Sequence, residues 1–203
     1  KTGESKVSWK LVNLLDPTQP QFVKTKLSLS MDIAAYPIEG GKYIVTFSQL
    51  NNANGTGITV QLLQVTPGGI KLLHNKAETV LLESKGGYSS IYSDITSSSR
   101  AFRYIPQSQT IVFPVHAVTY DNYTSTSSFD GFLVYHVNLE KGVTYVHNVT
   151  AQNDGNWCTV MPEQSMDISG NLFTFMNGAI KKTSLANPLS AENWEEQLRC
   201  SYY

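Results

Sequence analysis

Hydrophobic and polar residues alternate in short runs along most of the 203-residue chain. Between residues 132 and 139, the odd-numbered positions form a strongly apolar face and the even-numbered positions a mixed one. A period of two predicts β-strands that pack on a neighbouring sheet. The predicted strands are Val7–Leu15, Gln21–Leu29, Lys42–Leu50, Gly57–Thr66, Ile70–Leu82, Arg100–Ile105, Thr110–Val118, Gly131–Leu139, Gly142–Val149 and Asn171–Met176.

Turn signals separate these runs, among them Asn54-Gly55, Pro67-Gly68-Gly69 and Asn177-Gly178. Connections this short join antiparallel strands, whereas parallel strands require long crossovers. Helical features are confined to Ala191–Leu198, where we predict a short helix with Ser190 as its N-cap. The pattern predicts an all-β fold.

The order of the strands repeats along the chain. A short strand, an apolar strand, a polar-alternating strand and a closing strand occur over residues 32–73 and again over 101–146, and the order restarts at 167–182. Repeated four-stranded antiparallel units are typical of β-propeller blades, with a β-sandwich as the alternative. We predict one propeller portion: the end of a blade at 7–30, blades at 31–84 and 99–150, a partial blade at 158–187 and a C-terminal tail at 188–203.

Several segments support this interpretation by resemblance. They are Leu14–Pro17 before Pro20, Arg100–Pro106, Ile111–Val115, Asp130–Tyr135, Asp167–Phe175 and Asn177–Lys181. In this order they resemble a family of secreted bacterial and archaeal proteins with a C-terminal β-propeller distantly related to WD40 repeats. The resemblance covers about residues 8–187 and implies a propeller without established catalytic residues. The chain departs from the family in its shorter length and in Cys158-Thr159-Val160, where an arginine is expected.

About three blades are too few to close a ring, which has about 4 to 8. An incomplete ring leaves open sheet edges and an uncovered blade face. We therefore expect an incomplete propeller whose remaining blades come from a missing N-terminal region, a processed partner chain or a neighbouring subunit.

Composition narrows the setting of the protein. Charged residues make up 15% of the chain and the net charge is −1, without a block of Lys or Arg, so a nucleic-acid or anionic-membrane footprint is absent. No run approaches the roughly 18 apolar residues of a membrane span. The chain starts at Lys1 without a signal-peptide pattern, so we expect a mature or truncated form. The low charge favours a secreted, extracellular or cell-surface protein.

Candidate modification sites agree with that setting. Three Asn-x-Ser/Thr sequons predict glycosylation at Asn54, Asn122 and Asn148. Cys158 and Cys200 are predicted to form a disulfide, with two separate buried thiols as the alternative. A disulfide closing a loop of about 43 residues would stabilise the fold by roughly 4 kcal/mol in the chain-entropy model.

Motifs for catalysis, cofactors or metals are not evident, so we predict no catalytic, cofactor-binding or metal-binding residue. His116 and His136 could meet across paired strands, but we interpret them as structural. Asp121–Asp130 is predicted to be a glycosylated loop, with a Ca²⁺ site as the alternative. The carboxylates without the spacing of a glycosidase pair are Asp32, Asp94, Asp130, Asp154 and Asp167.

These observations predict a non-catalytic extracellular module for binding, adhesion or structural assembly, without a cofactor. Its expected partners are other protein chains, which supply missing blades or neighbouring subunits, with extracellular glycans as a further class. The alternative is a hydrolase or lyase that degrades extracellular polysaccharide or protein at the propeller axis. Paired carboxylates or a histidine cluster at that axis would favour the enzyme.

Overall fold

The computed structural model describes most of the central part of the chain. The described residues are 11–13, 21–23, 34–67, 69–83, 88–96, 98, 100–121, 124–150, 162–176, 179–187 and 194–197. In these ranges the regular structure consists of β-strands and the short 3-10 helices η1 (Glu39–Gly41), η2 (Asp94–Thr96) and η3 (Pro106–Ser108). The predicted all-β fold is confirmed. The described part contains no helix long and apolar enough to cross a membrane.

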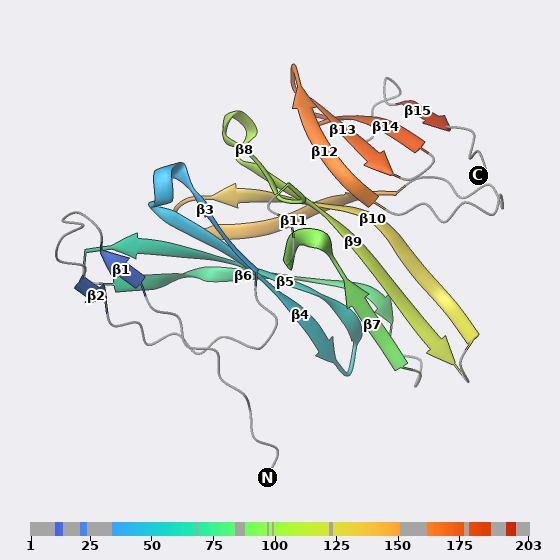
Figure 1. Ribbon diagram of the computed structural model, residues 1–203, viewed down its shortest axis with the longest axis horizontal. Coiled ribbons are helices and arrows are strands. Elements are labelled where there is room, and N and C mark those ends of the chain that lie inside the picture. The colour runs from blue at the N-terminus through green and yellow to red at the C-terminus, as the bar shows by residue number, and fades with distance from the viewer. Residues whose placement is uncertain are drawn as a thin grey trace, which may run out of the picture.

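The strands form three larger antiparallel sheets, which we name the first, second and third sheet in chain order (Figure 1). The first sheet consists of β3 (Ala34–Ile38), β4 (Tyr43–Asn52), β5 (Gly55–Thr66) and β6 (Gly69–Glu83). These strands pair in sequence order, as expected for consecutive hairpins. Two further strands, β1 (Leu11–Asn13) and β2 (Gln21–Val23), form a separate pair.

The second sheet repeats this order with one addition. Its strands are β7 (Tyr88–Tyr92), β8 (Arg103–Ile105), β9 (Thr110–Asp121), β10 (Thr124–Asn138) and β11 (Gly142–Val149). Strands β7 and β8 pair with different parts of β9 along the same edge, and β10 pairs along the other. Strand β7 was not predicted, because its sequence Tyr-Ser-Ser-Ile-Tyr lacks a regular alternation of apolar and polar residues.

The predicted loop at Asp121–Asp130 is wrong, because this segment belongs to the hairpin of β9 and β10. The two strands continue their pairing as far as Asp121 and Thr124. Threonine is enriched in β-strands, so a segment of this composition is compatible with a long antiparallel hairpin. The oxygen-rich composition of this segment therefore reflects strand pairing.

The third sheet contains β12 (Pro162–Ile168), β13 (Asn171–Met176), β14 (Ala179–Ser184) and β15 (Trp194–Gln197). The turn between β12 and β13 has positive φ at both Ser169 and Gly170, as in the type I′ turns of two-residue hairpins. Strand β15 lies where the short helix was predicted, so that prediction is wrong for residues 194–197. This part of the predicted tail instead pairs with β14, and Lys181 Nζ lies 3.5 Å from Glu195 Oε2 across the pair.

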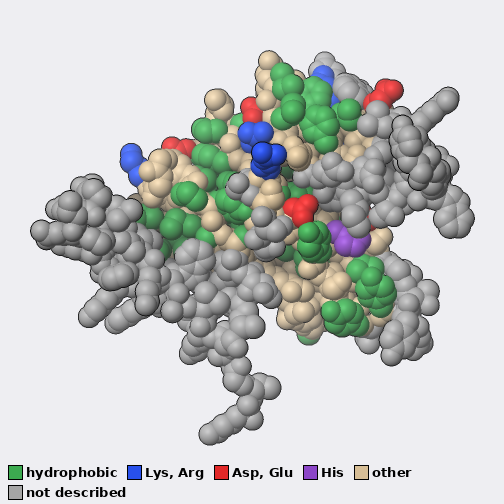
Figure 2. All heavy atoms as spheres, viewed as in Figure 1, with side chains coloured by type: hydrophobic (Ala, Val, Ile, Leu, Met, Phe, Trp, Pro, Cys, Tyr) green, Lys and Arg blue, Asp and Glu red, His purple; other side chains and the backbone are tan. Residues whose placement is uncertain are grey.

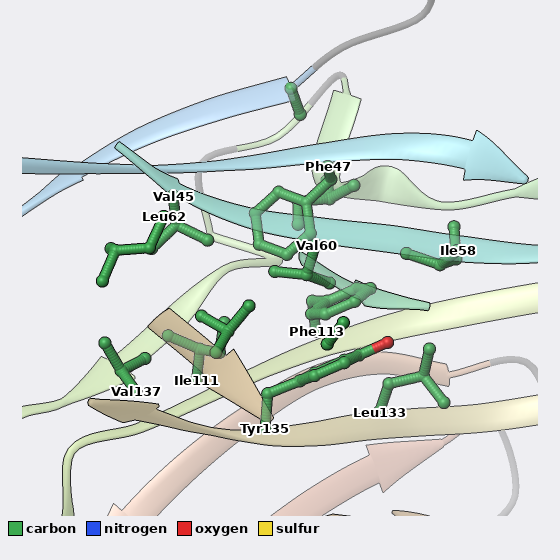
Figure 3. Close-up of a cluster of buried hydrophobic side chains, with 14 of the residues drawn as sticks. Val45, Phe47, Ile58, Val60, Leu62, Ile111, Phe113, Leu133, Tyr135 and Val137 are labelled. Carbon is green, nitrogen blue, oxygen red and sulfur yellow. The ribbon is translucent and has the colours of Figure 1, made fainter. Parts of the chain in front are cut away.

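The second sheet is covered on both faces, because successive residues of its central strands point in opposite directions. Odd-numbered residues such as Phe113 and Tyr135 join the core shared with the first sheet. Figure 3 shows these two rings beneath Phe47 and Val60. Even-numbered residues of the same strands join the core shared with the third sheet. That second core consists of Ile105, Val112, Phe132, Val134, Val149, Leu172 and Met176.

Candidate functional site

The candidate functional site lies where the second and third sheets meet through their edge strands. Strand β8 pairs only with β9, and β12 is the first strand of the third sheet, so each has a free edge in the described structure. The two strands lie close together. Arg103 Nη2 donates a 3.3 Å hydrogen bond to the backbone oxygen of Ser165 and connects them.

A pocket of about 480 Å³ opens along this junction. It is lined by Arg100, Phe102 and Arg103 from the β8 side, and by Gln164, Ser165, Met166 and Phe175 from the third sheet. Both arginines are exposed, and neither guanidinium has an ion-pair partner among the residues that the structure describes. Figure 2 shows Lys and Arg side chains gathered near the middle of this face, over β8. The pocket is therefore positively charged.

Aromatic contacts with the first sheet hold the β8 side of the pocket in place. The ring of Phe102 stacks on that of Tyr36, with centroids 4.4 Å apart and planes 12° apart. It also contacts Phe47 edge-on, at a centroid distance of 5.8 Å. Such pairs contribute about 0.5–1.5 kcal/mol beyond burial. The Arg100–Arg103 segment is thus attached to a packed core.

Tyrosine hydroxyls add polar contacts to this attachment. The Tyr36 hydroxyl donates to the backbone oxygen of Ile95, and the Tyr104 hydroxyl donates to Glu39 Oε1 at 2.5 Å. Burial raises the pKa of both tyrosines; for Tyr104, the hydrogen bond to Glu39 and the charge of that carboxylate raise the pKa further. Both hydroxyls are therefore protonated donors at neutral pH.

The outer face of the third sheet is a second feature of interest. The strand register places Met166, Ile168, Phe173, Phe175 and Ile180 on this face, which is opposite to the core shared with the second sheet. Met166 is 39% exposed and Ile168 is 50% exposed, whereas Leu172, Thr174 and Met176 of the inner face are buried. The described structure thus leaves Met166 and Ile168 accessible on one side of its terminal sheet.

The predicted modification sites are only partly within the described residues. Asn54 is exposed in the turn between β4 and β5, and Asn148 is exposed on β11. They lie on different sheets, so the structure does not bring them together. Asn122, Cys158 and Cys200 lie outside the described residues. Glycosylation and the disulfide stay predictions.

His116 and His136, which we interpreted as structural, do not meet across the paired strands. His116 faces Asp130 across β9 and β10, and its Nδ1 contacts Asp130 Oδ1, whereas His136 lies opposite Thr110. Among the described histidine, cysteine and acidic residues, no group of three could hold a metal ion.

The remaining candidate carboxylates are dispersed. Asp94 Oδ1 accepts a 2.5 Å hydrogen bond from the Tyr92 hydroxyl, and Asp167 is exposed on β12. Asp32 and Asp154 lie outside the described residues.

The sequence did not lead us to predict that Arg100 and Arg103 line the same pocket. The spacing of the two arginines in Arg-Ala-Phe-Arg was the available local signal. The other wall of the pocket comes from β12, far away in sequence, and nothing local indicates that contact.

Comparison with known proteins now identifies the type of domain. A sequence model of the family described as Beta propeller domain matches residues 40–187, which is more than half of the chain. No curated protein and no solved structure matches it. The family match confirms propeller blades and sets aside the β-sandwich alternative. With its successive antiparallel sheets of four or five strands, the chain belongs to the Beta propeller domain family.

Proposed function

We propose that this chain is a non-catalytic extracellular propeller module that assembles with a further blade through the outer face of its third sheet. The exposure of Met166 and Ile168 on that face is the observation that carries the proposal. An apolar surface on a terminal sheet is a common mark of an interaction site.

The second sheet indicates what kind of partner fits. Its two faces are each covered by another antiparallel sheet of the same chain. The third sheet is covered in the same way on its inner face, where Leu172 and Met176 are buried. A further four-stranded blade would cover the outer face by the same mode of packing, and a ring requires about 4 to 8 blades.

The chemistry of the described pocket supports binding in preference to catalysis. Its lining contains guanidinium, amide, hydroxyl, thioether and aromatic groups, but neither the paired carboxylates nor the histidine cluster that the enzyme alternative requires. An extracellular setting is supported by the low charged fraction of 15% and by the exposed sequon residues Asn54 and Asn148.

The assembly proposal can be tested with a charge placed on the outer face. Ile168→Glu adds a carboxylate where a blade would pack, and Val146→Glu is the matched control, because Val146 is 48% exposed on β11. Light scattering after gel filtration reports mass, and the dye ANS reports accessible apolar surface. We expect the wild-type chain to self-associate or to bind ANS, Ile168→Glu to reduce that signal, and Val146→Glu to preserve it.

The two wild-type outcomes distinguish the source of the blade. Concentration-dependent association identifies a second copy of this chain. A monomer that binds ANS at the outer face identifies a blade from another polypeptide. A wild-type monomer without ANS binding overturns the proposal, as does an equal effect of the two substitutions.

A further inference from the structure

We propose that the pocket between β8 and β12 binds a carboxylate group attached to an apolar body. This inference goes beyond assembly through the outer face, because it rests on the charge and shape of the pocket. It concerns a ligand and would hold even if no further blade packed on the third sheet.

The two arginines define the charge of the ligand. Each guanidinium presents N–H donors in a planar fork that matches the two oxygens of a carboxylate. Arg103 is oriented by its hydrogen bond to the Ser165 carbonyl, and this bond uses only part of its donor capacity. Arg100 has no described side-chain partner. With neither guanidinium neutralised by a described carboxylate, an incoming anion is the complementary group.

The rest of the lining defines the body of the ligand. Phe102, Met166 and Phe175 provide aromatic and thioether surface beside the arginines, and the amide of Gln164 can donate or accept a hydrogen bond. A volume of about 480 Å³ lies within the range of small-molecule sites, which is about 300–1,000 Å³. A small inorganic anion would leave this apolar surface uncovered, whereas an arylalkyl carboxylate would cover it.

A buried hydroxyl supplies an independent observation. Ser165 lines the pocket, is only 5% exposed, and has no hydrogen-bond partner for its Oγ among the described residues. Its side chain lies on the inner face of the third sheet with Thr174, toward β8 and β9. Buried hydroxyls are usually satisfied, so an unpaired one in the wall of a cationic pocket points to an acceptor supplied by a ligand.

The carboxylate could come from a free organic acid or from the C-terminal residue of a peptide. Two matched pairs of probes separate these sources. The first pair is 3-phenylpropionate and its neutral amide, 3-phenylpropionamide. The second pair is the tripeptide Gly-Gly-Phe with a free carboxyl terminus and the same tripeptide with an amidated terminus.

Binding is measured by calorimetry on the full chain, with Arg100→Gln as the test variant and Lys71→Gln as the control. Lys71 is an exposed cation on β6 outside the pocket. We expect the acids to bind at least about tenfold more tightly than the amides, because charge-assisted hydrogen bonds are lost with the charge. We expect Arg100→Gln to weaken acid binding by about tenfold and Lys71→Gln to leave it unchanged.

The pattern of binding identifies the source or overturns the inference. Preference for the tripeptide acid assigns a peptide terminus, and preference for 3-phenylpropionate assigns a free acid. Equal affinity for acids and amides, an unchanged affinity in Arg100→Gln, or no binding of any probe up to about 10 mM would show that the pocket is not a carboxylate site. Circular dichroism verifies that each variant is folded, so loss of binding is not confused with unfolding.

Discussion

Truncating Phe132 to alanine tests whether the second sheet is packed from both sides. Phe132 has 0% exposure and lies in the core between the second and third sheets, opposite Pro114 on β9 and Val149 on β11. Phe132→Ala removes the apolar area of the ring and leaves a cavity, and such changes cost about 3–5 kcal/mol. This loss is a large share of a typical folding stability of about 5–15 kcal/mol.

Phe113→Ala is the matching change on the opposite face of the same sheet. Phe113 is also fully buried, and its ring centroid lies 4.5 Å from that of Phe47 and 5.8 Å from that of Tyr135. Each aromatic pair adds about 0.5–1.5 kcal/mol, so Phe113→Ala should fall at the upper end of the range or above it. Phe132→Leu keeps part of the apolar area and should cost less than Phe132→Ala.

Urea unfolding followed by circular dichroism measures these free energies. We expect both Phe132→Ala and Phe113→Ala to lower the free energy of unfolding strongly, because the two residues lie on opposite covered faces of the second sheet. The packing of the third sheet on the second would be refuted if Phe132→Ala lowered the free energy of unfolding by less than about 1 kcal/mol while Phe113→Ala lowered it by about 3–5 kcal/mol. An effect of less than about 1 kcal/mol is what a surface substitution produces.

Three further changes test particular contacts. Tyr135→Phe removes a buried 2.8 Å hydrogen bond to Thr79 Oγ1, and urea unfolding should report a loss of about 1–2 kcal/mol, whereas an unchanged midpoint would contradict the bond. Gly57→Ala places Cβ 1.9 Å from the backbone oxygen of Thr79, so the melting temperature should fall by an amount equivalent to more than about 1 kcal/mol; an unchanged melting temperature would contradict this close approach. Burial lowers the pKa of His147 from 6.5, so the unfolded state binds the proton more readily, and stability should fall as the pH decreases from about 6.5 toward the folded-state pKa. His147→Gln should flatten this part of the pH profile, and identical profiles for the variant and the wild type would refute the role of His147.

The alternation of residues 132–139 was sufficient to predict a strand with an apolar face. It did not predict that part of the mixed face would be buried. Phe132 and Val134 on that face are buried against the third sheet, whereas His136 beyond them is exposed. A mixed pattern here marks a strand that is covered along part of its length. The extent of the covering sheet depends on contacts between distant segments, which periodicity does not contain.

Strand β15 shows how pairing can override a local preference. Its Glu and Gln residues favour a helix in isolation, and they misled our prediction for this segment. In the structure, Glu196 lies opposite Ile180 and Trp194 lies opposite Lys182, so β14 provides the backbone hydrogen bonds. A helix propensity of a few tenths of a kcal/mol per residue is easily exceeded by tertiary pairing.

The pocket and the outer face of the third sheet share side chains, and this has a consequence for both proposals. Met166 and Phe175 line the pocket and, by strand register, also belong to the outer face. A blade that packs over these two residues changes the walls of the pocket, so assembly and carboxylate binding must be linked, with equal effects in both directions. The sign of the coupling free energy between assembly and carboxylate binding shows where the blade packs relative to the pocket. A blade that walls the pocket would strengthen the attraction between arginine and carboxylate by excluding water, whereas a blade that closes the pocket mouth would weaken binding.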